Sequence, residues 1–141
     1  DIVEAVKDTE HLQKNLVKYS NSTNEHIKEQ YNIIKKDLAE LLRDIDTISK
    51  MSEEDEIILL LSKVKVYLER YDILANGTLD NLIRNSLITN EMATSLMNDS
   101  TYAYNIGKNF IAMSEILFID NNSDMVLSGY DVDLILEKKD N

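Results

Sequence analysis

The feature that most constrains this chain is its lack of residues that break helices: 141 residues contain no proline and three glycines. Proline and glycine most often form the tight turns between strands, so their scarcity disfavours sandwiches, barrels and hairpins. Long helices joined by short polar connections remain. The length suits one domain with a single core.

Apolar residues recur at three- and four-residue steps, which is the pattern of amphipathic helices. Residues 2–19 form a first such segment, and the polar stretch 20–24 separates it from a long stripe over 27–48. This stretch contains several side chains that can cap a new helix. We therefore predict two helices in the first third of the chain.

A third helix is predicted to begin with Ser52 as its N-cap, because the acidic residues 53–56 that follow favour the positive end of a helix dipole. Its stripe continues to Ala75, and the pair Asn76-Gly77 is typical of a left-handed C-terminal residue. Thr78 can then cap a short helix. This order predicts a rod that is interrupted near Gly77.

A final long helix is predicted from about Asn90 to Ile119, with Thr89 at its start. Short connections between long helices favour antiparallel neighbours. The predicted fold is therefore all-α: an up-and-down helical bundle of three or four long helices, one of them interrupted. We assign it to residues 1–124 and leave 125–141 as a C-terminal tail whose apolar set is too short to assign.

Charge and composition exclude several classes of function. The net charge of −11 repels nucleic acid and anionic lipid headgroups. The absence of cysteine excludes thiolate chemistry, and no phosphate loop or nucleophile elbow occurs, so we expect neither an enzyme nor a cofactor. The longest apolar run, residues 57–61, is far shorter than the roughly 20 residues of a membrane helix, so direct membrane insertion is not expected.

Asp99 is the candidate site residue, because it falls within the apolar arc of the last helix. On a wheel of 100° per residue this arc contains Met92, Leu96, Ala103, Ile106, Phe110, Met113 and Leu117. An unpaired buried charge costs several kcal/mol, so Asp99 must find a partner. We favour a hydrogen bond from a tyrosine, with Tyr31 and Tyr102 among the candidates, and keep a metal or ligand role as the alternative.

Other polar residues carry weaker signals. Asn98, Asn105 and Asn109 form a stripe beside that arc, which is either a partner-binding face or a solvated surface. Glu4, Asp8 and His11 have the spacing of metal ligands on one helix but lie opposite its apolar stripe, which favours a surface role. His26 lacks a Glu-x-x-His partner and is interpreted as structural. Small residues on the last helix, Gly107 and Ser114 among them, should let another helix approach closely.

The stretch from Leu79 to Ile119, LDNLIRNSLITNEMATSLMNDSTYAYNIGKNFIAMSEILFI, resembles the last helical hairpin of PhoU-type domains. More narrowly, it is similar to the cytosolic C-terminal region of bacterial sodium/phosphate cotransporters. The resemblance implies a helical regulatory bundle beneath a membrane part. In PhoU proteins a Glu-x-x-x-Asp-x-x-x-Asn motif binds metal; this chain has Ser95, Asp99 and Ala103 at that register, so only the aspartate matches.

Two functions from different classes follow from these observations. The first is a regulatory or oligomerisation domain of a bacterial membrane transporter, plausibly for sodium-coupled phosphate transport, at the cytoplasmic face of the membrane. Its partner would be the transmembrane part of the same protein or a second copy. Because the chain begins with Asp1, we expect a piece of a longer protein. The alternative is a free-standing PhoU-like signalling regulator that binds a metal ion or a partner protein.

Overall fold

The structure is a computed structural model that describes residues 2–70, 72–73 and 76–119, leaving aside the side chains of residues 2, 4–6, 8 and 70. The end of the predicted domain at residue 124, the tail 125–141 and Ala75, where the third predicted stripe ends, lie outside the described residues.

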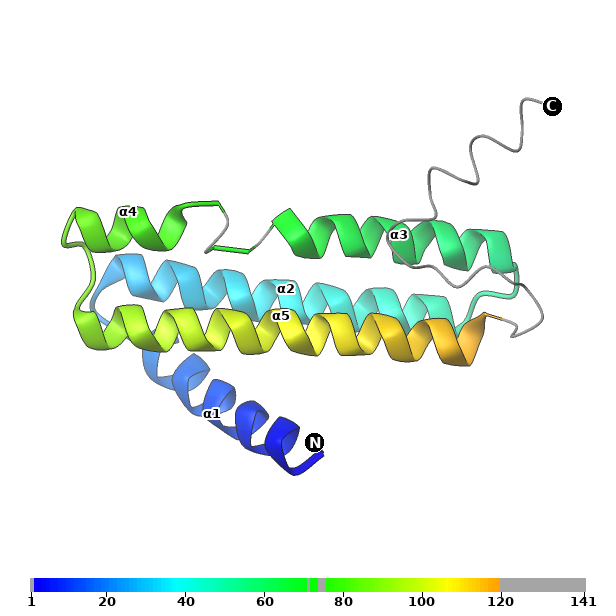
Figure 1. Cartoon of the computed structure of the whole chain (residues 1–141), viewed down its shortest axis with the longest axis horizontal. Coiled ribbons are helices and arrows are strands. Elements are labelled where there is room, and N and C mark those ends of the chain that lie inside the picture. The colour runs from blue at the N-terminus through cyan, green and yellow to red at the C-terminus, as the bar shows by residue number, and fades with distance from the viewer. Residues whose placement is uncertain (1, 71, 74–75, 120–141) are drawn as a thin grey trace.

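The described residues form α-helices and connecting segments, as the sequence predicted (Figure 1). In chain order the helices are α1 (Ile2–Ser20), α2 (Glu25–Ser49), α3 (Glu54–Arg70), α4 (Thr78–Arg84) and α5 (Asn90–Phe118). The predicted all-α class is confirmed.

The parallel helices α2 and α5 form the centre of the bundle, side by side along most of their length (Figure 1). The interrupted rod α3–α4 runs antiparallel to both of them on one side. On the other side α1 packs against α2 and α5 near their N-terminal ends and diverges from them toward its own N-terminus. Among the residues that the structure describes, one end of the bundle therefore has four helices in section and the other end has three, which agrees with the predicted architecture.

Side-chain caps fix the starts of the two central helices. Asn24 Oδ1 accepts the backbone N–H groups of His26 and Ile27 at 3.0 and 3.1 Å, which satisfies donors that a helix start leaves free. Asn24 also donates to the Leu87 carbonyl at 2.9 Å and so ties the start of α2 to the α4–α5 loop. At α5 the Thr89 hydroxyl accepts the N–H of Met92, as predicted.

The starts of α3 and α4 differ from the prediction by one residue each. In α3 the carbonyl of Glu53 accepts the first helical bond, so the cap position is Glu53 and not Ser52. In α4 the cap position is Gly77, with Thr78 as the first helical residue. There Asn76 Oδ1 accepts the Thr78 N–H at 3.0 Å and takes the role predicted for the threonine hydroxyl.

The interruption of the rod also lies earlier than predicted, because α3 ends at Arg70 and not beside Asn76. Gly77 does adopt the left-handed conformation, with φ of 79°, a region that glycine enters without strain. The Leu79 N–H reaches back across it to the carbonyl of Ile73 at 3.3 Å. Ile73 is buried against α4, so the break lets the chain place an apolar side chain in the core between the two halves of the rod.

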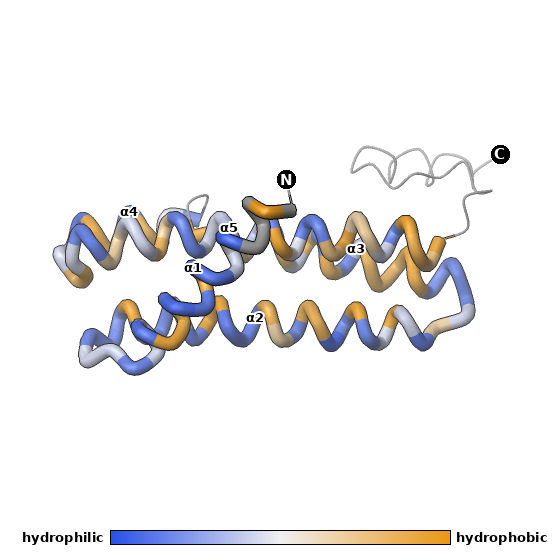
Figure 2. Tube along the Cα trace, turned by 90° about the horizontal axis from the view of Figure 1, so that it is seen from below, coloured by the Kyte–Doolittle hydropathy of each residue, from blue (hydrophilic) through white to orange (hydrophobic). Residues whose placement is uncertain are grey.

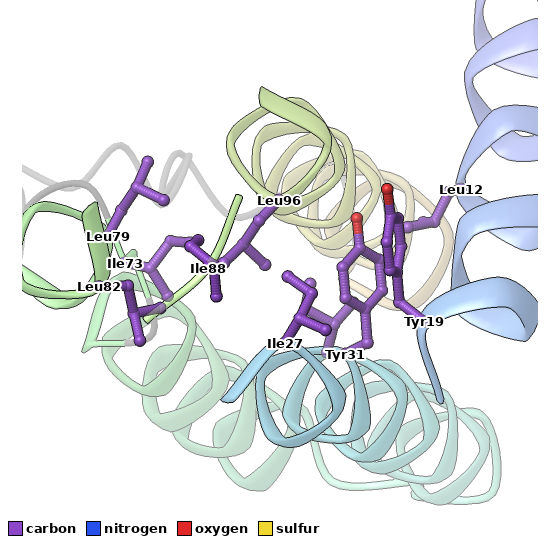
Figure 3. Close-up of a cluster of buried hydrophobic side chains, with 10 residues drawn as sticks. Leu12, Tyr19, Ile27, Tyr31, Ile73, Leu79, Leu82, Ile88 and Leu96 are labelled. Atoms are coloured by element: carbon purple, nitrogen blue, oxygen red, sulfur yellow. The ribbon is translucent and has the colours of Figure 1, made fainter. Parts of the chain in front are cut away.

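The core consists of two apolar clusters, one at each end of the bundle. The first draws on α1, α2, α4 and α5 and contains Leu12, Tyr19, Ile27, Tyr31, Ile34, Ile73, Leu79, Leu82, Ile88 and Leu96 (Figure 3). The second draws on α2, α3 and α5 and contains Leu41, Ile48, Ile57, Leu61, Val64, Ile111 and the neighbouring Ile119. Orange and blue residues alternate along each helix in Figure 2, which is the amphipathic pattern that buries these stripes.

The predicted buried arc of α5 is correct in its first half and wrong at its end. Leu96 and Asp99 are buried, but Met113 and Leu117 are 54% and 68% exposed. The residues buried at that end are Ile111 and Ser114, which face α2 and α3. The reason is that α1 does not extend over this half, so the side of α5 that α1 covers elsewhere faces solvent here.

Candidate functional site

Asp99 lies in the core between α1, α2 and α5 and is 1% exposed. Its Oδ2 accepts a hydrogen bond from the Tyr31 hydroxyl on α2. The same oxygen accepts a second bond from Asn15 Nδ2 on α1, at 2.8 Å. We call these three residues the Asp99 cluster. The predicted hydrogen bond from a tyrosine is confirmed, and Tyr31 is one of the named candidates.

Aromatic packing supports the cluster. The rings of Tyr19 and Tyr31 are stacked with centroids 4.8 Å apart, and Figure 3 shows them side by side between α1 and α2. The Tyr19 hydroxyl donates to Ser95 Oγ on α5 at 3.4 Å. One carboxylate and two tyrosines therefore join the three helices that meet at this end of the bundle.

Burial dominates the electrostatics of the cluster. Burial raises the pKa of Asp99 above its ordinary value, although the bonds from Tyr31 and Asn15 and the nearby His11 lower it. Burial also raises the pKa of Tyr31, and the bond to Asp99 raises it further. The tyrosine therefore stays protonated and remains a donor. Two donors on one oxygen satisfy a buried acceptor, which is the usual state of such groups in proteins.

Asn15 is the partner that sequence reasoning missed. It lies on α1 between the buried Leu12 and Tyr19 and is itself half-buried. The available signal was the spacing of Leu12, Asn15 and Tyr19, which places all three on adjacent turns of one side of α1.

The metal role of Asp99 stays a prediction. Of the two other positions at the motif register, Ser95 bonds Tyr19 and Ala103 is a packing residue. Within the described part of the chain, no three His, Cys, Asp or Glu side chains are grouped so as to hold a metal ion. The side chains of Glu4 and Asp8 lie outside the described residues, and the third member of that set, His11, is exposed.

Asn98, Asn105 and Asn109 all lie exposed on the same side of α5, as their spacing predicted. Their side continues toward the C-terminal end of the helix. We call the whole surface the α5 face; its exposed residues are Asn98, Thr101, Asn105, Asn109, Ala112, Met113, Ile116 and Leu117. No residue of this set is charged. The sequence predicts the asparagines on this side of α5 but places Met113 and Leu117 in the buried arc.

Gly107 lies on the opposite side of α5 and faces α2 and α3. A Cβ atom there would lie 2.8 and 2.9 Å from the two Cδ atoms of Leu68 and 3.4 Å from Leu41 Cδ2. The helices therefore approach closely at this point, as predicted from the small residues of α5. Leu41 belongs to the second core cluster and Leu68 packs against it.

A second group of carboxylates borders a small cavity between α2, α3 and α5. The cavity has a volume of about 60 Å³, roughly the space of two water molecules. Asp37 and Asp44 of α2 lie along it beside apolar side chains. Burial raises the pKa of Asp37 to about 6, and the neighbouring Glu40 adds to this shift while Lys36 opposes it.

Among the residues that the structure describes, no helix combines the length and the apolar character that a membrane crossing requires. Comparison of the chain with known protein families, with curated proteins and with solved structures finds no match.

Proposed function

We propose that this chain is a regulatory or oligomerisation domain of a bacterial membrane transporter and lies at the cytoplasmic face of the membrane. The regulatory or oligomerisation role is supported by the contrast between Asp99 and the α5 face. Asp99 is enclosed and accepts two hydrogen bonds from its own chain, whereas the α5 face is exposed, uncharged and apolar at one end. A surface of this kind serves contacts with protein rather than chemistry on a substrate.

The transporter part of the proposal rests on the resemblance of residues 79–119 to the last hairpin of PhoU-type domains in sodium/phosphate cotransporters. The arrangement of α4, its loop and the capped start of α5 is compatible with that hairpin. Sodium-coupled phosphate transport is then the expected activity of the whole protein. The partner is its transmembrane part or another copy.

Cell fractionation tests the attachment to a membrane part. An epitope tag is added at the C-terminus of the chromosomal gene, and membrane and soluble fractions are compared by immunoblot. We expect a membrane-bound band well above the 16.2 kDa of this chain. A soluble band close to that mass would exclude the transporter and favour the free-standing regulator.

Uptake measurements test the transported ion. Deletion of the gene should lower sodium-dependent uptake of radiolabelled phosphate, and the wild-type gene should restore it. Sulfate uptake in the same cells is the control for a general loss of membrane energisation. Unchanged phosphate uptake together with a membrane-bound product would keep the membrane attachment and reject phosphate.

A further inference from the structure

Charge is distributed unevenly over the helices of this acidic protein. Of the 25 residues of α2 ten are charged, but the 29-residue α5 contains only Glu91, Asp99, Lys108 and Glu115. Asp99 is buried, Glu91 pairs with Lys18 of α1, and Glu115 pairs with Lys65 of α3. Lys108 borders the α5 face and lies 5.4 Å from the ring of Tyr104. The α5 face is therefore uncharged although the whole chain has a net charge of −11.

The C-terminal end of this face is apolar, and none of the helices that the structure describes packs over it. Met113, Ile116 and Leu117 are 54–70% exposed. Leu42 on the neighbouring α2 is also 53% exposed. Figure 1 shows that α1 diverges before this point, so among the described residues α2 and α5 continue here without α1 beside them.

The residue composition of the α5 face indicates which kind of partner binds to it. A cationic partner would be recognised by acidic residues, and this face has none. Depletion of charge with apolar residues at the centre is typical of protein interfaces. An amide both donates and accepts, so an asparagine can pair with its own symmetry mate, whereas two carboxylates or two ammonium groups would repel. We propose that a second copy of this chain covers the α5 face in a two-fold dimer.

Two acidic copies can approach through this face because it keeps their charges apart. In a two-fold dimer both copies use the same patch. Met113, Ile116 and Leu117 of one copy therefore pack against the half of the other copy that its own α1 does not cover. The polar end contributes Asn98, Asn105 and Asn109. This pairing gives the three-helix half of each bundle the cover that α1 gives to the other half.

The size of the face predicts a dimer that dissociates on dilution. From Asn98 to Leu117 the helix extends about 30 Å, and a helix is about 10 Å wide, so α5 alone offers on the order of 300 Å². A standard interface buries about 800 Å² per partner. Even with the exposed Leu42 added, the contact stays below that area, which places it among small interfaces.

The inference rests on the assembly part of the proposed function and not on the attachment to a transporter. Sedimentation velocity of this chain over a range of concentrations measures self-association directly. We expect a monomer–dimer equilibrium in the micromolar range. Ile116→Asp should raise the dimer Kd about tenfold or more, because the two-fold axis introduces the buried charge twice.

Leu59→Asp is the matched control, since Leu59 is a similarly exposed apolar residue on α3, away from the α5 face. It should leave the dimer Kd unchanged. Circular dichroism of both variants should match that of the wild type, because both side chains are exposed. A wild-type chain that stays monomeric up to high micromolar concentration, or equal effects of the two variants, would overturn the inference.

Cysteine cross-linking locates the contact, because the chain has no cysteine of its own. Single cysteines are introduced at Asn98, Asn105, Asn109 and Ala112, with Leu59→Cys as the control. Mild oxidation should give disulfide-linked dimers most rapidly at one or two adjacent positions of the α5 face, those nearest the axis. Cross-linking at Leu59 that is as rapid as at every α5 position would refute this contact. Failure here with a membrane-bound product in cells would leave the transporter proposal in place.

Discussion

Removal of the Tyr31 hydroxyl tests the structural role of the Asp99 cluster. Tyr31→Phe keeps the ring and its stacking on Tyr19 but deletes the donor to Asp99, and both partners are almost fully buried. A hydrogen bond to a charged group contributes about 1.5–3 kcal/mol. Asn15 retains its bond to the same oxygen, so we expect a loss of about 2 kcal/mol in the free energy of unfolding at pH 7.

Urea denaturation followed by helical circular dichroism measures this loss. With an m-value of about 2 kcal/mol per molar, the midpoint should fall by about 1 M. Tyr67→Phe is the matched control, because the Tyr67 hydroxyl donates to Glu40 at 3.0 Å at the exposed surface of α2 and α3. Surface substitutions of this kind change stability by about 0.5 kcal/mol or less.

The pH dependence gives an independent check. The bond from Tyr31 lowers the pKa of Asp99, so its removal should raise that pKa further above the unfolded value. The difference between wild type and Tyr31→Phe should therefore be largest where Asp99 is charged and shrink as the pH falls through its raised folded pKa. A loss no larger than that of Tyr67→Phe, or a loss that is the same at every pH, would refute the reasoning.

Three further substitutions test packing, capping and charge by the same urea assay. Gly107→Ala should change stability by less than about 1 kcal/mol, because the gain in helix propensity opposes the contact with Leu68, whereas Gly107→Val should lose more than about 2 kcal/mol; equal effects would contradict this packing. Asn24→Ala should lose about 1–2 kcal/mol and exceed Thr89→Ala, since Asn24 makes an additional bond to the α4–α5 loop; the reverse order would be inconsistent with that tie. The folded pKa of Asp37, about 6, lies above its unfolded value, so its contribution to stability is complete below pH 4 and is lost as the pH rises through 6. Asp37→Asn should therefore raise the midpoint at pH 7 and not at pH 4, and a variant that tracks the wild type at both would rule this out.

The sequence predicts most of the fold because its local signals agree with each other. Polar capping residues such as Asn24 and Thr89 stand directly before apolar stripes, so the bounds of α2 and α5 follow from the sequence. The start of α3 is displaced by one residue from Ser52, because several consecutive polar residues can occupy a cap position. The early end of α3 depends on the burial of Ile73 against α4, which is a tertiary contact.

Local signals in the sequence also predict part of the candidate site. The position of Asp99 within an apolar arc indicates a buried carboxylate, and the nearby tyrosines suggest its donor. Asn15 comes from a helix 84 positions away in the chain. Its spacing with Leu12 and Tyr19 indicates the core-facing side of α1, but its contact with Asp99 depends on how α1 packs against α5. The exposure of Met113 and Leu117 depends on how far α1 extends over α5, and periodicity within α5 contains no information on its neighbours.

Native mass spectrometry of the purified chain, with and without added divalent metal, tests the central claim most directly because it reports assembly and bound ions together. Wild type, Ile116→Asp and Asp99→Asn are compared. We predict a metal-free dimer for wild type and Asp99→Asn, and a monomer for Ile116→Asp. A wild-type monomer with a stoichiometric metal ion that Asp99→Asn removes would contradict the account and favour a metal-binding regulator.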